Sequence, residues 1–391
     1  MLLKRFPNWP KGYFNYAGFF KAQGKLPQSK TALLKVIELD PEHAGAYLAL
    51  TEVSTASESK RLILAMIRLL EKLNSRPETQ SLRRIQLHYG LGHALADQSN
   101  YAEAFEHWQH ANRLQLRNCQ FRVVQMKPVF DEIARVFSLL QYDLVTDRGT
   151  DKLTPIFIVG LPRSGSTLLE QMLSSHEEIE TAGEVHYLAD ILVRKLSELT
   201  GENYPRGLQK ISREQFLQLG DAYLEKLQGH HPQSKYIIDK LPANFQSIGL
   251  IRKALPHAII VHLNRNPMAV GISVYRNYFL ANEPYFCDLD EFAEYHQLYK
   301  ELMSFWRGFD PASLYELTYE SLIDSPKEQL SALLEYCGLT WQDQCLEFHK
   351  ANNRVTTLSA GQVRQPLYRG SVDDWRHYSP FLQDFEAKIN R

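Results

Sequence analysis

The residues best suited to chemistry form one short stretch, Gly-Leu-Pro-Arg-Ser-Gly-Ser-Thr at positions 160–167. Four apolar residues precede it, Ile156 to Val159, and predict a buried strand. The leucines and methionine that follow recur at helical spacing. Strand, tight loop and helix in this order direct backbone N–H groups and the positive end of the helix dipole at one point. The stretch therefore predicts a binding site for an anion.

The spacing inside the loop indicates which anion. Gly160, four residues, Gly165 and then Ser166-Thr167 follow the nucleoside-triphosphate loop pattern, but Ser166 stands where that pattern has lysine. The cation is instead inside the loop, at Arg163. We therefore expect a site for a phosphate or sulfate group rather than for a metal-bound triphosphate. For the loop taken alone, an ordinary strand–turn–helix is the alternative.

Other reactive side chains follow further predicted strands. In open α/β sheets, ligands bind beyond the carboxyl ends of the strands. A carboxylate at that edge lies at the mouth of the sheet, and a lysine there can neutralise charge on a departing oxygen. Taken singly, Glu184 could be a solvated surface residue, and Lys240 could be a surface lysine paired with Asp239. The three candidates are Glu184 after a short strand from Ile179, Lys240 at the end of a strand from Tyr236, and Arg265 shortly after a strand at 258–263.

These motifs resemble, in order, those of sulfotransferases that use 3′-phosphoadenosine 5′-phosphosulfate (PAPS). The resemblance covers roughly residues 155–380 and is strongest to the tyrosylprotein sulfotransferases and their bacterial relatives. Each motif alone is common, whereas the ordered set is specific. The set comprises Pro-Arg-Ser-Gly at 162–165, Gly-Glu at 183–184, Lys-x-Pro at 240–242, Arg-x-Pro at 265–267 and Ser-x-x-Gln-Val at 359–363.

The resemblance implies a role for each matching residue. Glu184 would be the general base that takes the proton of an acceptor hydroxyl, Lys240 the catalytic lysine, and Ser359 a hydrogen-bond donor to the sulfuryl group. His186 is a secondary candidate. The resemblance also implies that no metal is required. The 5′-phosphosulfate group would contact the loop residues Arg163, Ser164, Gly165, Ser166 and Thr167.

A second anion pocket is implied for the 3′-phosphate. Arg265 would supply a two-pronged guanidinium and Ser273 a hydroxyl to this phosphate. Tyr319 would lie on or near the adenine, with a plain structural tyrosine as the alternative. Arg369 resembles a phosphate ligand of the cytosolic sulfotransferases, although Tyr368 and Asp373 depart from their loop. The roles of Arg276 and Arg364 stay open, since Arg276 is one residue out of register and Arg364 could be a surface charge.

Composition limits the class of protein. The chain has 391 residues, 44% hydrophobic residues and a formal net charge of −1, which indicates a globular protein that does not generally bind nucleic acid or membrane surfaces. Four scattered cysteines predict free thiols in a reducing compartment. Since we find neither a secretory pattern at the start nor an apolar run of about 20 residues, we expect a cytoplasmic protein.

The first part of the chain, 1–148, predicts an all-α repeat domain. Tyr89–Leu95 and Tyr101–Ala111 match the tetratricopeptide pattern of small and large side chains. The same template fits upstream, giving about three helix pairs, near the minimum for such an array. We expect either a concave surface that binds a peptide partner or a scaffold without a ligand.

Together, these features predict a parallel α/β sheet flanked by helices at 149–391, with the sulfotransferase fold, after the helical domain at 1–148. The function predicted is transfer of a sulfuryl group from PAPS to a hydroxyl acceptor by in-line displacement. A nucleotide-dependent kinase with a phosphate-binding loop, or a non-catalytic scaffold with a relic nucleotide domain, is the alternative. The acceptor stays open among a peptide tyrosine presented by the repeats, a sugar, a lipid and a small phenol, and so does the oligomeric state.

Overall fold

The fold is taken from a computed structural model. It describes residues 5–74, 81–140, 153–229, 234–281, 283–311, 314–350, 355, 357 and 361–391. The predicted domain boundary at 148/149 lies outside the described residues, and so does Ser359.

The N-terminal part is helical, as predicted. Its consecutive helices pack on one another, and small residues let them approach closely. A Cβ on Gly92 would lie 2.2 Å from Nε1 of the buried Trp108, so only glycine fits there. Assignment of the helices to the tetratricopeptide class stays a prediction. The helices are α2 (Pro10–Ala22), α3 (Leu26–Leu39), α4 (Ala44–Thr51), α5 (Ala56–Asn74), α6 (Ser81–Ala96) and α7 (Tyr101–Leu116).

The second part contains the predicted parallel sheet. Its strands are β1 (Thr154–Gly160), β2 (Ile179–Gly183), β3 (Tyr236–Asp239), β4 (Ile259–Asn264) and β5 (Leu314–Thr318), in the spatial order β2-β3-β1-β4-β5. The central strand β1 pairs with β3 and β4, and every pairing is parallel. The expected α/β fold is confirmed.

Helices cover both faces of this sheet, which explains why β1 is apolar at successive positions. Phe157 and Val159 join one hydrophobic core, while Ile156 and Ile158 join the other. The α-helices of this second part are α9 (Ser166–Leu173), α10 (Arg194–Thr200), α11 (Arg213–Gln228), α12 (Ile248–Ala254), α13 (Pro267–Tyr275), α14 (Pro284–Cys287), α15 (Leu289–Phe309), α16 (Tyr319–Asp324), α17 (Pro326–Tyr336), α18 (Gly370–Asp373) and α19 (Gln383–Ile389).

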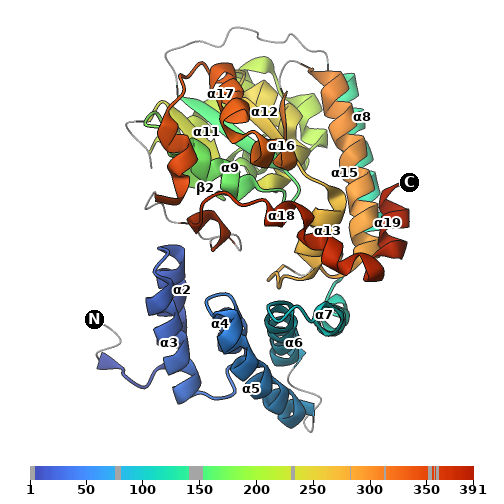
Figure 1. Ribbon diagram of the computed structural model, residues 1–391. Coiled ribbons are helices and arrows are strands. Elements are labelled where there is room, and N and C mark those ends of the chain that lie inside the picture. The colour runs from blue at the N-terminus through green and yellow to red at the C-terminus, as the bar shows by residue number, and fades with distance from the viewer. Residues whose placement is uncertain are drawn as a thin grey trace.

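The helix α8 (Lys127–Leu139) precedes the sheet in sequence but packs beside α15 (Figure 1). The ring of Phe137 meets that of Trp306 edge-on, with centroids 5.0 Å apart. Figure 1 also shows helices α2–α7 grouped on one side of the molecule, with the C-terminal stretch at α18 running between them and the sheet.

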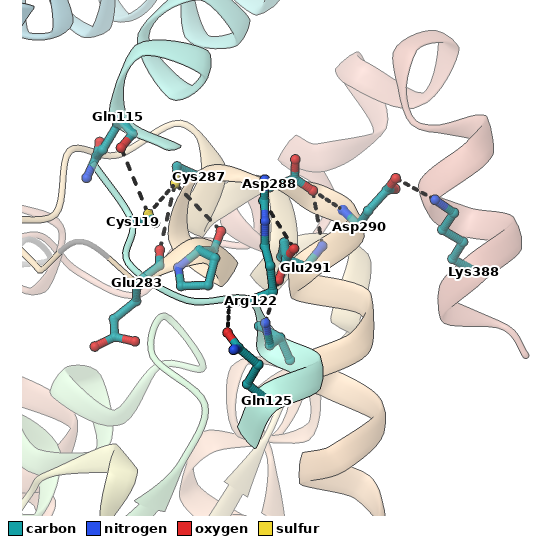
Figure 2. Close-up of polar contacts among 12 residues, drawn as sticks. Gln115, Cys119, Arg122, Gln125, Glu283, Cys287, Asp288, Asp290, Glu291 and Lys388 are labelled. Atoms are coloured by element: carbon teal, nitrogen blue, oxygen red, sulfur yellow. Dashed lines mark hydrogen bonds and ion pairs between the residues drawn. The ribbon is translucent and has the colours of Figure 1, made fainter. Parts of the chain in front are cut away.

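Helix α7 joins the two parts through hydrogen bonds to the chain after α13. Asn112 donates from Nδ2 to the carbonyl oxygen of Tyr275 at 2.8 Å, and Gln115 donates from Nε2 to that of Phe279 at 2.9 Å. Figure 2 shows the adjoining contacts, where the sulfur atoms of Cys119 and Cys287 lie 3.8 Å apart. The helical part is therefore fixed to the segment that follows Ser273.

All four cysteines are free, and three are buried. In the described parts of the chain, we find no helix with the length and apolar character required to cross a bilayer.

A histidine pair between α6 and α7 makes stability depend on pH. Nδ1 of His88 lies 2.9 Å from Nδ1 of His107. Burial, together with His107, His110 and Arg84, lowers the pKa of His88 to about 3. Because the folded state disfavours the protonated ring, the stability contributed by His88 is complete above about pH 6.5 and is lost as the pH falls toward 3.

We expect His88→Gln to flatten this dependence. Between pH 8 and pH 5, the unfolding free energy of the wild type should fall by up to about 2 kcal/mol more than that of the variant. Urea unfolding at the two pH values measures the difference. An equal loss in both proteins would show that His88 is protonated as easily in the folded as in the unfolded chain.

Candidate active site

The candidate residues come from the carboxyl ends of adjacent strands, so the strand order sets their order in space. Glu184 follows β2, Lys240 follows β3, and the loop 160–165 follows β1. Arg265 follows β4, and Tyr319 follows β5. The predicted catalytic pair therefore lies on one side of the phosphate loop, and the predicted nucleotide residues lie on the other.

The loop has the backbone that an anion cradle needs. Gly165, at the N-cap of α9, has φ of +101°, and a Cβ there would lie 2.3 Å from Cδ2 of Tyr319. Arg163 has φ of +68°, which non-glycine residues rarely adopt. Ser164 is 1% exposed, and its Oγ has no hydrogen-bond partner among the described residues. An unsatisfied buried hydroxyl at a helix N-terminus suits a bound oxyanion.

The predicted phosphosulfate and 3′-phosphate residues meet in this structure. Arg163 donates from Nε to Oγ of Ser273 at 3.0 Å, and Arg265 donates from Nη1 to the carbonyl oxygen of Arg163 at 2.8 Å. Nε of Arg265 is buried and has no partner among the residues described. The two predicted anion pockets are therefore contiguous.

Tyr319 lies against both of these elements. The guanidinium carbon of Arg265 is 4.3 Å from the centre of the Tyr319 ring, and the Tyr319 hydroxyl lies 2.6 Å from Oγ of Ser371. The carbonyl oxygen of Ser371 accepts a hydrogen bond from Nη2 of Arg265 at 2.5 Å. These contacts fix the plane of the guanidinium that would bind a phosphate.

A cavity of about 360 Å³ opens between the loop and these residues. Arg163, Arg265 and Arg276 all line it, with Ser273 and Tyr319. Burial and repulsion by Arg276 and Arg265 lower the pKa of Arg163 to about 10. Arg276 is ion-paired with Asp374, which raises the pKa of Arg276 against the opposing effect of burial. Three guanidinium groups around one cavity are suited to a ligand with several negative charges.

The predicted catalytic pair is also formed. Nζ of Lys240 lies 2.5 Å from Oε1 of Glu184. The Lys240 side chain is 1% exposed, whereas that of Glu184 is 45% exposed. Parallel pairing explains the contact, because Gly183 of β2 is in register with Asp239 of β3. Within the described ranges, no group of three or more His, Cys, Asp or Glu side chains is arranged to hold a metal ion.

Some predicted residues lie elsewhere. Arg369 is 75% exposed at its side chain and pairs with Asp324 at 2.8 Å, so its guanidinium points away from the cavity, although Gly370 lines it. Arg364 donates to the carbonyl oxygen of Ala22 at 3.1 Å and so contacts the helical part. The Thr167 hydroxyl lies 3.1 Å from that of Thr357, and Ser166 is buried in the first turn of α9.

The sequence reasoning missed Glu170 and Ser371. Glu170 is 4% exposed and contacts Lys240, with Oε2 3.5 Å from Nζ. A carboxylate within the apolar helix pattern after the loop could have signalled it, because Glu170 is flanked by Leu169 and Met172 of the buried face. Ser371 contacts Arg265 through its backbone carbonyl, which no residue type predicts, and Tyr319 through its hydroxyl.

Comparisons with known proteins point to one family. Residues 155–343 match a family model described as the sulfotransferase family. The chain is 30% identical over 370 residues to an uncharacterized protein of Aquifex aeolicus, covering 92% of this chain and 47% of that protein. It thus spans about half the length of that relative.

Other relatives, including the following two, have names that describe an activity. The protein-tyrosine sulfotransferase 2 of Gallus gallus is 23% identical over 272 residues, covering 66% of this chain and 72% of that protein. The omega-hydroxy-beta-dihydromenaquinone-9 sulfotransferase of Mycobacterium bovis is 33% identical over 114 residues, covering 27% and 29% of the two chains.

The glycine at the helix N-terminus provides a test of the anion cradle. Gly165→Ala should lower the affinity for adenosine 3′,5′-bisphosphate by at least about tenfold, because the new methyl group collides with Tyr319 and strains the loop. Calorimetric titration measures this loss. Gly308→Ala is the matched control, since its Cβ would meet no atom within 4 Å, and should bind as the wild type does. Unchanged affinity in Gly165→Ala would contradict the cradle.

Proposed function

We propose that this chain, whose residues 155–343 match the sulfotransferase family, transfers the sulfuryl group of PAPS to a hydroxyl acceptor. One observation supports this proposal most strongly. The loop at the end of β1 separates the Glu184–Lys240 pair from the cavity lined by Arg163 and Arg265. PAPS carries a phosphate on the 3′ oxygen of its ribose and a phosphosulfate on the 5′ oxygen. Bound across this loop, it would present its sulfate to the Glu184–Lys240 pair.

In the proposed reaction, the Glu184 carboxylate takes the proton of the acceptor hydroxyl. The hydroxyl oxygen forms a bond to sulfur while the bond from sulfur to the bridging oxygen breaks. The electron pair of the broken bond stays on that oxygen, which becomes part of adenosine 3′,5′-bisphosphate. A hydroxyl is a weak nucleophile while protonated, which is why a base is needed.

Fixed cations supply the electrostatic stabilisation. Lys240 is buried at the end of β3, where its ammonium can neutralise charge on the bridging oxygen. Arg163 and the N–H groups at the start of α9 would bind the phosphosulfate, and Ser359 remains the proposed donor to the sulfuryl group. On the other side of the loop, Arg265 and Ser273 would bind the 3′-phosphate, with Tyr319 beside the adenine.

For the acceptor, we propose a hydroxyl group on a partner that the helical part helps to select, with a tyrosine-bearing peptide as the first candidate. A second cavity of about 440 Å³ lies between the two parts. His93 and Tyr101 of the helical part line it together with Arg163 and Arg276. The names of the relatives include a protein tyrosine and an omega-hydroxy-beta-dihydromenaquinone, so an acceptor panel should include both classes.

The general base is tested by a charge-removing substitution. Glu184→Gln should keep adenosine 3′,5′-bisphosphate affinity within about threefold, since Glu184 lies outside the nucleotide cavity, but reduce kcat by about 100-fold or more. Transfer of labelled sulfate from PAPS across the acceptor panel measures kcat, and calorimetry measures binding.

Glu178→Gln provides the control, because this exposed carboxylate lies between α9 and β2 and should leave kcat unchanged. Wild-type rates in Glu184→Gln would remove Glu184 from the role of base.

A further inference from the structure

The buried carboxylate of Glu170 lies behind the Glu184–Lys240 pair. Glu170 belongs to α9, one turn beyond the phosphate loop, and is 4% exposed. Its Oε1 accepts a hydrogen bond from the Thr181 hydroxyl at 2.6 Å, and its Oε2 lies 3.5 Å from Nζ of Lys240. Thr181 Oγ1 also accepts a hydrogen bond from the backbone N–H of Gly183 at 3.0 Å. Glu170 is therefore tied to both segments that carry the catalytic pair.

The Lys240 ammonium thus lies between two carboxylates of different character. Glu184 is 45% exposed at its side chain, so it can reach an acceptor, whereas Glu170 is enclosed. Burial raises the pKa of Glu170, against the opposing effects of Lys240 and the Thr181 hydrogen bond, and Glu184 adds repulsion. A buried charged group is costly unless it is paired, so Glu170 and Lys240 stabilise each other in this interior.

We propose that Glu170 is a positioning residue that holds the Lys240 ammonium in place while Glu184 exchanges its negative charge for the acceptor proton. The inference rests on the proposed function. When the oxygen–sulfur bond forms and the proton moves to Glu184, Lys240 loses the charge of one of its two anionic partners. Glu170 remains ionised and stays beside the Lys240 ammonium. The ammonium therefore remains directed at the oxygen that departs with the nucleotide.

Other titratable groups around Glu170 do not duplicate this role. Glu184 faces it from the end of β2 and Lys240 from the end of β3. Asp239 is also close, but its two oxygens are engaged by Tyr223 and Asn244 at 2.6 and 3.2 Å. Burial raises the pKa of Asp239 to about 7. Glu170 is therefore the buried carboxylate placed against the lysine ammonium.

The test compares Glu170→Gln and Glu170→Asp with the wild type. N-acetyltyrosinamide serves as a phenolic acceptor probe alongside the acceptor panel. Glutamine keeps the size and an oxygen for Thr181 but removes the charge, so kcat should fall at least about tenfold, with the KM for PAPS changed less than about threefold. Both limbs of the pH profile of kcat should move to lower pH by about one unit, because protons leave more readily once a neighbouring negative charge is gone. Glu170→Asp should restore the wild-type profile in part.

The outcomes separate the two proposals. If the wild type transfers sulfate and the Glu170→Gln variant has the same kcat and pH profile, the role of Glu170 is overturned and the proposed function is not. If the wild type transfers no sulfate to any acceptor, the proposed function fails and this inference fails with it. Binding of adenosine 3′,5′-bisphosphate shows whether each variant is folded. If Glu170→Gln does not fold, a Glu170→Asp variant with a reduced kcat and limbs displaced to lower pH by less than one unit supports the role, because the shorter carboxylate lies farther from the ammonium, and one with the kcat and profile of the wild type contradicts it.

Discussion

Parallel pairing brings the carboxyl ends of all five strands to one edge of the sheet, and this constraint determines where the site residues that follow a strand lie. The order β2-β3-β1-β4-β5 puts Glu184 and Lys240 on one side of the loop after β1 and Arg265 and Tyr319 on the other. For these residues, strand order and register bring the side chains to one place. Glu170, Arg276 and Asp374 reach the site from helix α9 and from the ends of α13 and α18.

Much of this arrangement could be predicted from the sequence. β1 was recognisable because a strand covered on both faces is apolar at successive positions, and the loop because glycines recur where the backbone must turn. Glu184, Lys240 and Arg265 were identified because each comes after a predicted strand and belongs to a motif of the resembled family, Gly-Glu, Lys-x-Pro and Arg-x-Pro. How these side chains lie relative to one another depends on the order of the strands in the sheet. No local pattern of a single sequence encodes that order.

The remaining features depend on contacts between distant segments. Glu170 is a polar residue on a buried helical face. The hydrophobic periodicity of the helix therefore gives no reason to assign it a role. Arg369 follows a loop whose residues at 368 and 373 differ from the resembled pattern, and in the structure it pairs with Asp324. Helix α8 belongs by sequence to the helical part, yet its aromatic face packs on α15. The domain boundary and the tetratricopeptide assignment stay predictions.

The helical part is coupled to the site through α7. Its side chains bind the backbone carbonyl groups of Tyr275, the last residue of the helix that carries Ser273, and of Phe279 beyond it. Arg364 donates a hydrogen bond to the carbonyl oxygen of Ala22 at the end of α2. The described residues of the N-terminal helices do not line the cavity that contains Arg265, but they line the second cavity together with Arg163 and Arg276.

The central claim is that one nucleotide bridges two adjoining anion pockets without a metal. Calorimetric titration of the wild type in magnesium-free buffer with adenosine 3′,5′-bisphosphate and with adenosine 5′-phosphate tests it most directly. We expect the bisphosphate to bind at least about tenfold more tightly, because the second phosphate alone reaches Arg265 and Ser273. Equal affinities, or binding of ATP with magnesium in preference to the bisphosphate, would contradict the account.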